Sequence, residues 1–209
     1  MQQNGLTTMK TLLPLVALTL VALALAAQED LPRTEAVKFA AVLNFDLEKI
    51  ADTPIPTDAD IKRPFGLKAG NLGGLVVPEA KLSPATFSTA SKEAVSVGQL
   101  WLAGLVPAKD GQAVSKDQLK LVTVQHEGRE ITLPLCVLGV RKGAGGKLEL
   151  LVFGKGKEPL LALPLNPATS EQKWPLEFTA EGEGDGSARL TLSLVGKYEA
   201  SFLVTKASD

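Results

Sequence analysis

Cysteine and histidine are nearly absent from this sequence of 209 residues, which has one of each, at Cys136 and His126. A single cysteine cannot form a disulfide within the chain, so packing and hydrogen bonds must hold the fold together. One histidine and one cysteine also exclude a zinc or copper site built from several such ligands in one chain. The sequence therefore excludes disulfide scaffolds and metal sites rich in His and Cys.

Tryptophan and tyrosine are also scarce, and neither positive nor negative charge is in clear excess. The chain has two Trp and one Tyr, and 22 Lys and Arg against 23 Asp and Glu give a net charge of −1. Nucleic-acid binding needs a basic face, and an anionic membrane surface attracts a polybasic cluster. The balance of charges therefore argues against both partners.

One long apolar run is present, and it lies at the N-terminus. Lys10 is the only charge before "TLLPLVALTLVALALAA", residues 11–27, and Ala24-Leu25-Ala26 supplies the small residues that signal peptidase accepts. We expect residues 1–27 to be a cleaved export signal, which makes the protein periplasmic or secreted and leaves no membrane span in the mature chain. An uncleaved anchor is the alternative, but the run contains Pro14 and is shorter than the roughly 20 residues that a span needs.

From residue 119 onward, apolar and polar residues alternate between closely spaced turn residues, which indicates β-strands. Seven strands are predicted, within residues 119–128, 129–140, 147–154, 158–165, 174–180, 189–196 and 197–206. Gly196-Lys197 is expected to form a two-residue type II′ turn between the last two. This density of short strands predicts an all-β fold, an antiparallel β-sandwich of the immunoglobulin-like or jelly-roll-like type.

The N-terminal half is expected to cover this sandwich. Residues 35–52 alternate in a way that favours a strand, although a helical stripe behind a Thr34 cap fits the same residues. The members of that stripe are Phe39, Leu43, Leu47 and Ile50. Residues 53–74 contain prolines and glycines that favour an extended excursion. Two further strands are predicted within 75–83 and 94–107, the second interrupted by Gly98 and Gly104.

The polar residues 108–118 resemble a domain boundary. We nevertheless predict a single β-sandwich domain over residues 28–209, because the N-terminal half alone has too few strands to form its own core. A sub-boundary at 108–118 is the alternative.

Residues 181–186, "EGEGDG", have the composition of a cation site. Glu181, Glu183 and Asp185 alternate with glycines and could gather a calcium ion together with backbone carbonyls. An EF-hand loop is excluded, because its twelfth position would be Leu192 instead of glutamate. The motif lies between two predicted strands, so a solvated hairpin tip is the favoured interpretation and a calcium site the alternative.

Other residues could in principle bind a ligand or take part in catalysis, but each has a simpler structural interpretation. The glycine-rich residues 142–147 lack the Walker A spacing and precede a strand, which indicates a hairpin loop. Cys136 is expected to be buried and inert, which argues against a nucleophile pair with a solvated His126. Asp58 and Asp60 could act as acid and base only in a cleft, and an exposed turn is expected instead.

Trp174 is the candidate for contact with a carbohydrate, because "SEQKWP" places it at the polar start of a strand. Trp101, within "QLWLAG", is expected in the core, and an edge-packed Trp174 is the simpler interpretation of the second tryptophan.

Without a recognisable reactive centre, the sequence predicts an exported, non-catalytic β-sandwich that acts as a protein-binding or structural module of the envelope or extracellular space. Loops 142–146 and 181–186, or an unpaired sheet edge, are the expected contact surfaces. One alternative is a carbohydrate-binding module that uses Trp174 with calcium as its only cofactor. The other is a hydrolase that works through carboxylates.

Overall fold

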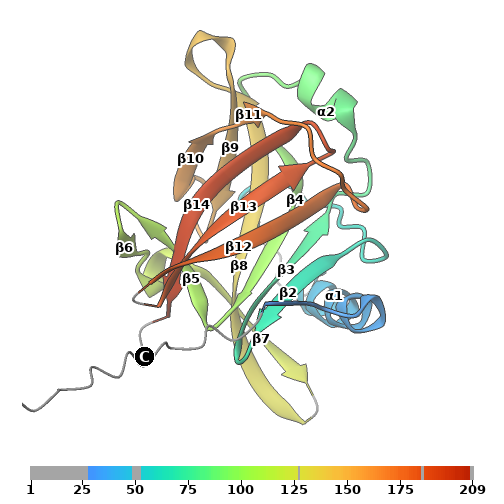
Figure 1. Cartoon of the computed structure of the whole chain (residues 1–209), viewed down its shortest axis with the longest axis vertical. Helices are drawn as coiled ribbons and strands as arrows, with labels where there is room; N and C mark the ends of the chain where they lie inside the picture. Colours follow the sequence, from blue (N-terminus) through green and yellow to red (C-terminus); the bar gives the residue numbers. More distant parts are fainter. Residues whose placement is uncertain (1–27, 49–52, 127, 185, 208–209) are drawn as a thin grey trace, which may run out of the picture.

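The computed structural model describes residues 28–48, 53–126, 128–184 and 186–207, so the predicted export signal lies outside the described residues. Most of the described chain forms antiparallel β-strands in two sheets, which confirms the all-β prediction (Figure 1). Among these residues, no helix is long and apolar enough to cross a membrane.

The larger sheet has eight strands within the described residues, in the order β1-β2-β3-β4-β8-β9-β10, with β7 also paired to β8. Their bounds are Glu29–Asp30 (β1), Phe65–Ala69 (β2), Leu72–Pro78 (β3), Val95–Ala103 (β4), Lys120–His126 (β7), Arg129–Lys142 (β8), Leu148–Phe153 (β9) and Leu161–Pro164 (β10). The long strand β8 pairs with β7 along its first half and with β4 and β9 along its second.

The smaller sheet has six strands in the described chain, in the order β12-β13-β14-β5-β6, with β11 paired to β14. Their bounds are Leu105–Lys109 (β5), Gln112–Ala113 (β6), Asn166–Pro167 (β11), Leu176–Gly184 (β12), Ser187–Leu194 (β13) and Tyr198–Lys206 (β14). The helices are α1 (Arg33–Glu48), α2 (Pro84–Ser88) and two 3-10 turns, Lys116–Gln118 and Ala144–Gly146.

The seven strands predicted after residue 119 all form, as β7 to β10 and β12 to β14. The alternation sets their register: Leu190 lies opposite Phe202 and Leu192 opposite Ala200, and all four side chains face the core. A shift of one residue would turn these side chains to solvent, so the buried face fixes the pairing.

The turn between β13 and β14 differs by one residue from the prediction. Its central residues are Val195 (φ 51°) and Gly196 (φ 66°), and the N–H of Lys197 donates to the carbonyl of Leu194 at 3.1 Å. Positive φ at both central positions is typical of a type I′ turn, so the predicted type II′ turn at Gly196-Lys197 is wrong.

Residues 33–48 form a helix, so the strand favoured for residues 35–52 is wrong. The helix buries Ala36, Ala40 and Leu43, at spacings of four and three residues, whereas Phe45 is 61% exposed although strand alternation would bury it. Alanine has the highest helix propensity, and its small side chain lets the helix approach the sheet closely. Of the helical alternative, the Thr34 cap is wrong, because the helix begins at Arg33 and already includes Thr34.

Residues 53–74 are only partly an extended excursion. Residues 53–64 contain one isolated bridge, between Ala59 and Glu79, but β2 and β3 form a hairpin immediately afterwards. Gly70 (φ 63°) starts its two-residue turn, and glycines within the two strands obscure the alternation that marks a strand.

Gly98 and Gly104 mark the irregularities expected within residues 94–107. The register of β4 shifts between Ser96 and Gly98, and Gly104 (φ 67°) separates β4 from β5. Since β4 belongs to the larger sheet and β5 to the smaller, the chain changes sheets at Gly104. β5 then pairs with β14, so the segment at 108–118 begins inside a sheet built mainly from C-terminal strands.

Two layers of apolar contacts bury the larger sheet on both faces. Its inner face packs against the smaller sheet, with Leu138 and Leu192 in one shared cluster. Its outer face packs against α1, where Leu43 and Trp101 belong to a second cluster. Trp101 is 2% exposed, which confirms its predicted place in the core.

Leu192→Ala is expected to lower the free energy of unfolding by about 2–5 kcal/mol, because it leaves a cavity between the sheets. Leu121→Ala, in a strand position that is 43% exposed, should cost less than about 0.5 kcal/mol. Urea denaturation followed by circular dichroism measures both. Equal losses in the two variants would contradict the assigned core.

Candidate functional site

A pocket of about 570 Å³ opens between the two sheets, where β2 turns into β3 and β12 turns into β13. This volume lies within the range of about 300–1,000 Å³ that is typical of small-molecule sites. Residues of both sheets form its walls, so the pocket continues the space that the apolar core fills elsewhere.

Small residues leave this space unfilled. Ala180, Gly182 and Ala188 line the pocket at the ends of β12 and β13, whereas the neighbouring inward-facing positions of these strands carry Phe178 and Leu190. Protein interiors are normally packed as densely as organic crystals, so inward-facing positions without a large side chain create a cavity. The composition of these strand ends therefore produces the pocket.

Phe178 closes the pocket on the side of the core. A Cβ added at Gly74 would lie 2.9 Å from the Phe178 Cζ, so the ring needs a glycine at that position. The ring also meets Phe65 edge-on, with centroids 5.7 Å apart. Other apolar walls are Leu67, Leu72, Leu102, Leu105 and Leu190. These walls suit an apolar ligand.

The "EGEGDG" motif forms the hairpin end of β12 and β13, which confirms the predicted turn. Its glycines Gly182, Gly184 and Gly186 line the pocket. Glu183 accepts a hydrogen bond from Arg189 at 2.6 Å. Asp185 lies outside the described residues, and those described contain no group of three His, Cys, Asp or Glu side chains that could hold a metal ion. The calcium site at Glu181, Glu183 and Asp185 stays a prediction.

Trp174 lies outside the pocket lining, just before β12. The guanidinium carbon of Arg33 lies 4.5 Å from its ring centroid, in a cation–π contact that covers one face of the indole. The N–H groups of Lys173 and Trp174 both donate to the Glu177 carboxylate at 2.7 Å. A sugar could therefore stack only on the other face, and the role of Trp174 in carbohydrate binding stays a prediction.

Cys136 is fully buried in the core between the sheets. Burial raises the pKa of its thiol to about 12, because the thiolate would lose its hydration. His126 ends β7, where its ring lies 4.9 Å from that of Phe39. The predicted burial of Cys136 is confirmed, and it removes the thiolate that a nucleophile needs.

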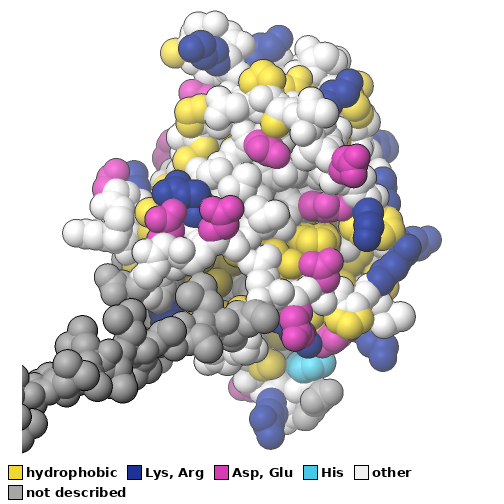
Figure 2. Space-filling view, viewed as in Figure 1, with side chains coloured by type: hydrophobic (Ala, Val, Ile, Leu, Met, Phe, Trp, Pro, Cys, Tyr) yellow, Lys and Arg dark blue, Asp and Glu magenta, His cyan; other side chains and the backbone are white. Residues whose placement is uncertain are grey.

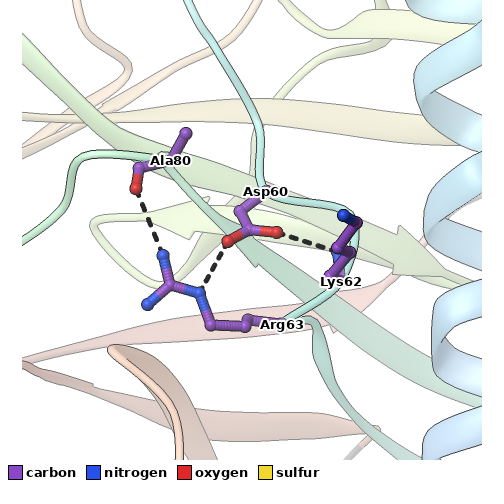
Figure 3. Close-up of polar contacts among 4 residues, drawn as sticks. All are labelled: Asp60, Lys62, Arg63 and Ala80. Atoms are coloured by element: carbon purple, nitrogen blue, oxygen red, sulfur yellow. Dashed lines mark hydrogen bonds and ion pairs between the residues drawn. The ribbon is translucent and has the colours of Figure 1, made fainter.

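Asp60 has a structural ion pair instead of a catalytic environment (Figure 3). Its carboxylate accepts hydrogen bonds from the Arg63 Nε at 2.6 Å and the Lys62 N–H at 3.0 Å, and Arg63 also donates to the carbonyl of Ala80. Partial burial raises the pKa of Asp60, but these bonds and the nearby positive charges together lower it below the usual value of an aspartate. Asp60 is therefore ionised at neutral pH.

Asp58 contributes its main chain to a second polar cluster. The Glu79 carboxylate is nearly buried and accepts hydrogen bonds from the Thr57 hydroxyl (2.5 Å), the Asp58 N–H (2.6 Å) and the Ser96 hydroxyl (2.6 Å). Through Glu79, which follows β3, and Ser96 of β4, these bonds attach residues 57 and 58 to the larger sheet. Sequence interpretation missed Glu79, because nothing in "VPEAK" marks this carboxylate as buried.

The sequence interpretation also missed the pocket. Its signal was the series of glycine and alanine residues at the ends of two neighbouring strands, in "EGEGDGSA". The sequence interpretation places "EGEGDG" in a hairpin turn, although a turn alone does not need small residues inside the adjoining strands.

No model of a known protein family matches this chain, and no curated protein or solved structure matches it either. On the face shown in Figure 2, acidic and basic side chains are interspersed, in keeping with the net charge of −1.

Asp60→Asn is expected to lower the free energy of unfolding at pH 7 by about 1 kcal/mol, since it removes a charge-assisted hydrogen bond. Because folding lowers the pKa of Asp60, this stabilisation is present above the unfolded pKa of about 3.9 and is lost as the pH falls through the folded value. Urea denaturation at pH 7 and at lower pH measures the difference.

Asp58→Asn is the matched control, because it removes the same charge while keeping the main-chain bond of Asp58 to Glu79. A loss at Asp60 that is independent of pH, or an equal loss in both variants, would contradict the ion-pair assignment.

The Cys136 thiol is expected to be unreactive towards Ellman's reagent at pH 8 in the folded protein, because it is buried and its pKa is about 12. In guanidinium chloride, one thiol per chain should react at once. Rapid stoichiometric reaction under native conditions would show that the thiol is accessible.

Proposed function

We propose that this protein is an exported, non-catalytic β-sandwich that binds a small apolar molecule between its sheets. One observation carries the proposal, the pocket of about 570 Å³ between β2–β3 and β12–β13. The proposal that the protein is exported rests on a separate observation, the apolar composition of residues 1–27.

The lining of the pocket supports an apolar ligand. Leucine, phenylalanine, alanine and glycine form most of its walls, and the polar residues in the lining are Gln28, Lys68, Ser187 and Lys206. Small-molecule sites usually combine a mainly apolar surface with a few polar groups that orient the ligand. Each methylene group buried on binding contributes about 0.8 kcal/mol.

The placement of reactive side chains supports binding over hydrolysis. The described residues that line the pocket include no His, Cys, Asp or Glu. A hydrolase working through carboxylates needs two acids that converge on one bond. Asp60 is instead held by Arg63, and the Glu79 carboxylate is occupied by three hydrogen bonds on the outer side of the larger sheet.

The proposal is tested with N-phenyl-1-naphthylamine, a neutral apolar dye that fluoresces when it leaves water. We expect the full chain to bind the dye and linear alcohols to displace it, with an affinity that rises about fourfold for each added methylene until the pocket is full. Fluorescence titration with alcohols of six to twelve carbons measures this slope.

Ala188→Phe provides the decisive variant, because Ala188 lines the pocket and a phenyl group there would occupy it. We expect a loss of dye affinity of at least about tenfold, since a filled apolar cavity no longer buries the ligand. Ala162→Phe, at an exposed position of β10, is the matched control. Unchanged dye binding by a folded Ala188→Phe variant would refute the pocket as the site.

A further inference from the structure

The pocket narrows from its opening towards the core. Three cross-strand pairs of β12 and β13 face the larger sheet here: Gly182 with Ala188, Ala180 with Leu190, and Phe178 with Leu192. The first pair is small, whereas in the third pair Leu192 is fully buried and Phe178 is 3% exposed. Because each residue of a strand advances about 3.3 Å, Phe178 lies about 13 Å along β12 from Gly182. A phenyl ring and a leucine therefore fill the inner end of the pocket.

The ring of Phe178 reaches across to the larger sheet. Its Cζ would lie 2.9 Å from a Cβ added at Gly74, so the ring takes the space that a side chain would fill there. Phe65 meets the same ring edge-on, with centroids 5.7 Å apart. Gly74 lies opposite Leu67 and Leu102 in the larger sheet, and all three line the pocket. The ring therefore closes the space between the two sheets.

Behind the ring, the core is closely packed. Val76, Leu100 and Leu176 occupy the next inward-facing positions of β3, β4 and β12, and each is fully buried. An apolar chain that enters between the hairpins meets Phe178 before it meets these residues. The position of the ring therefore decides how far the chain can enter.

We infer that Phe178 is a specificity-determining residue that sets the greatest length of alkyl chain the pocket accepts. This inference rests on the proposed function and adds that the ligand has a single alkyl chain of limited length. The chain lies along Ala180 and Leu190, and its end contacts the Phe178 ring. Each buried methylene raises the affinity about fourfold, so the affinity stops rising at the chain length that reaches the ring.

Phe178→Ala tests the inference, because it removes the ring and leaves an apolar space behind it. Apolar cavities of about 150 Å³ stay dry and bind molecules as large as benzene. We expect the longest alcohol that still gains affinity to become at least about two carbons longer, and to bind this variant about tenfold more tightly than the unaltered chain. Displacement of N-phenyl-1-naphthylamine from the full chain by linear alcohols of six to fourteen carbons measures this limit.

Phe87→Ala is the matched control, because it removes another buried phenyl ring from the same core cluster. Phe87 stacks on Tyr198, at the opposite end of β14 from Lys206, which lines the pocket. The cavity left at Phe87 should therefore leave the length limit unchanged.

Phe178→Leu is a milder variant, which keeps an apolar side chain and shortens it. We expect it to raise the length limit by about one carbon. Circular dichroism shows which variants are folded, and Phe178→Leu decides the question if Phe178→Ala does not fold.

The outcomes separate the inference from the proposed function. An unchanged length limit in a folded Phe178 variant, or an equal shift in Phe87→Ala, overturns the role of Phe178 and leaves an apolar site. An affinity that still rises at fourteen carbons in the unaltered chain overturns that role as well. Dye binding that is absent, or insensitive to Ala188→Phe, overturns the site itself.

Discussion

Face-to-face packing of the two sheets is the interaction on which the rest of the structure depends. The chain cannot form an internal disulfide, so the large side chains between the sheets hold them together. Leu138 and Val152 from the larger sheet meet Leu192 and Phe202 from the smaller one in a continuous cluster. The packing ends where glycine and alanine replace these residues, and there the molecule has a pocket instead of a core.

Both faces of the larger sheet are apolar and must be shielded from water. The smaller sheet shields one face, and the N-terminal half of the chain supplies the cover for the other. Along β8, Cys136 faces the smaller sheet, whereas Leu135 faces α1 on the other side. Such strands have no polar face, which is why "LPLCVLGV" is apolar throughout. Helix α1 covers part of the outer face. Residues 57 and 58 are held against the same sheet by their hydrogen bonds to the buried carboxylate of Glu79.

The C-terminal strands could be predicted because their alternation has only one interpretation. In "RLTLSLVG" the apolar residues at 190, 192 and 194 form one face of a strand and no face of a helix. Residues 33–48 were ambiguous, since leucine and phenylalanine suited both periods; the small Ala36 and Ala40, which the helix buries, give little hydrophobic signal. The pocket was harder still, because a missing side chain between two sheets becomes visible only when both sheets are in place.

The "EGEGDG" motif shows how one composition serves two requirements. Its acidic residues suggested a cation site, yet Glu183 pairs with Arg189 while the glycines line the pocket. Positive φ at Gly184 and Gly186 lets the strands reverse direction, and the missing side chain at Gly186 leaves room for the Lys206 stem. Larger residues at these positions would strain the turn and narrow the pocket together, so the hairpin and the opening depend on the same glycines.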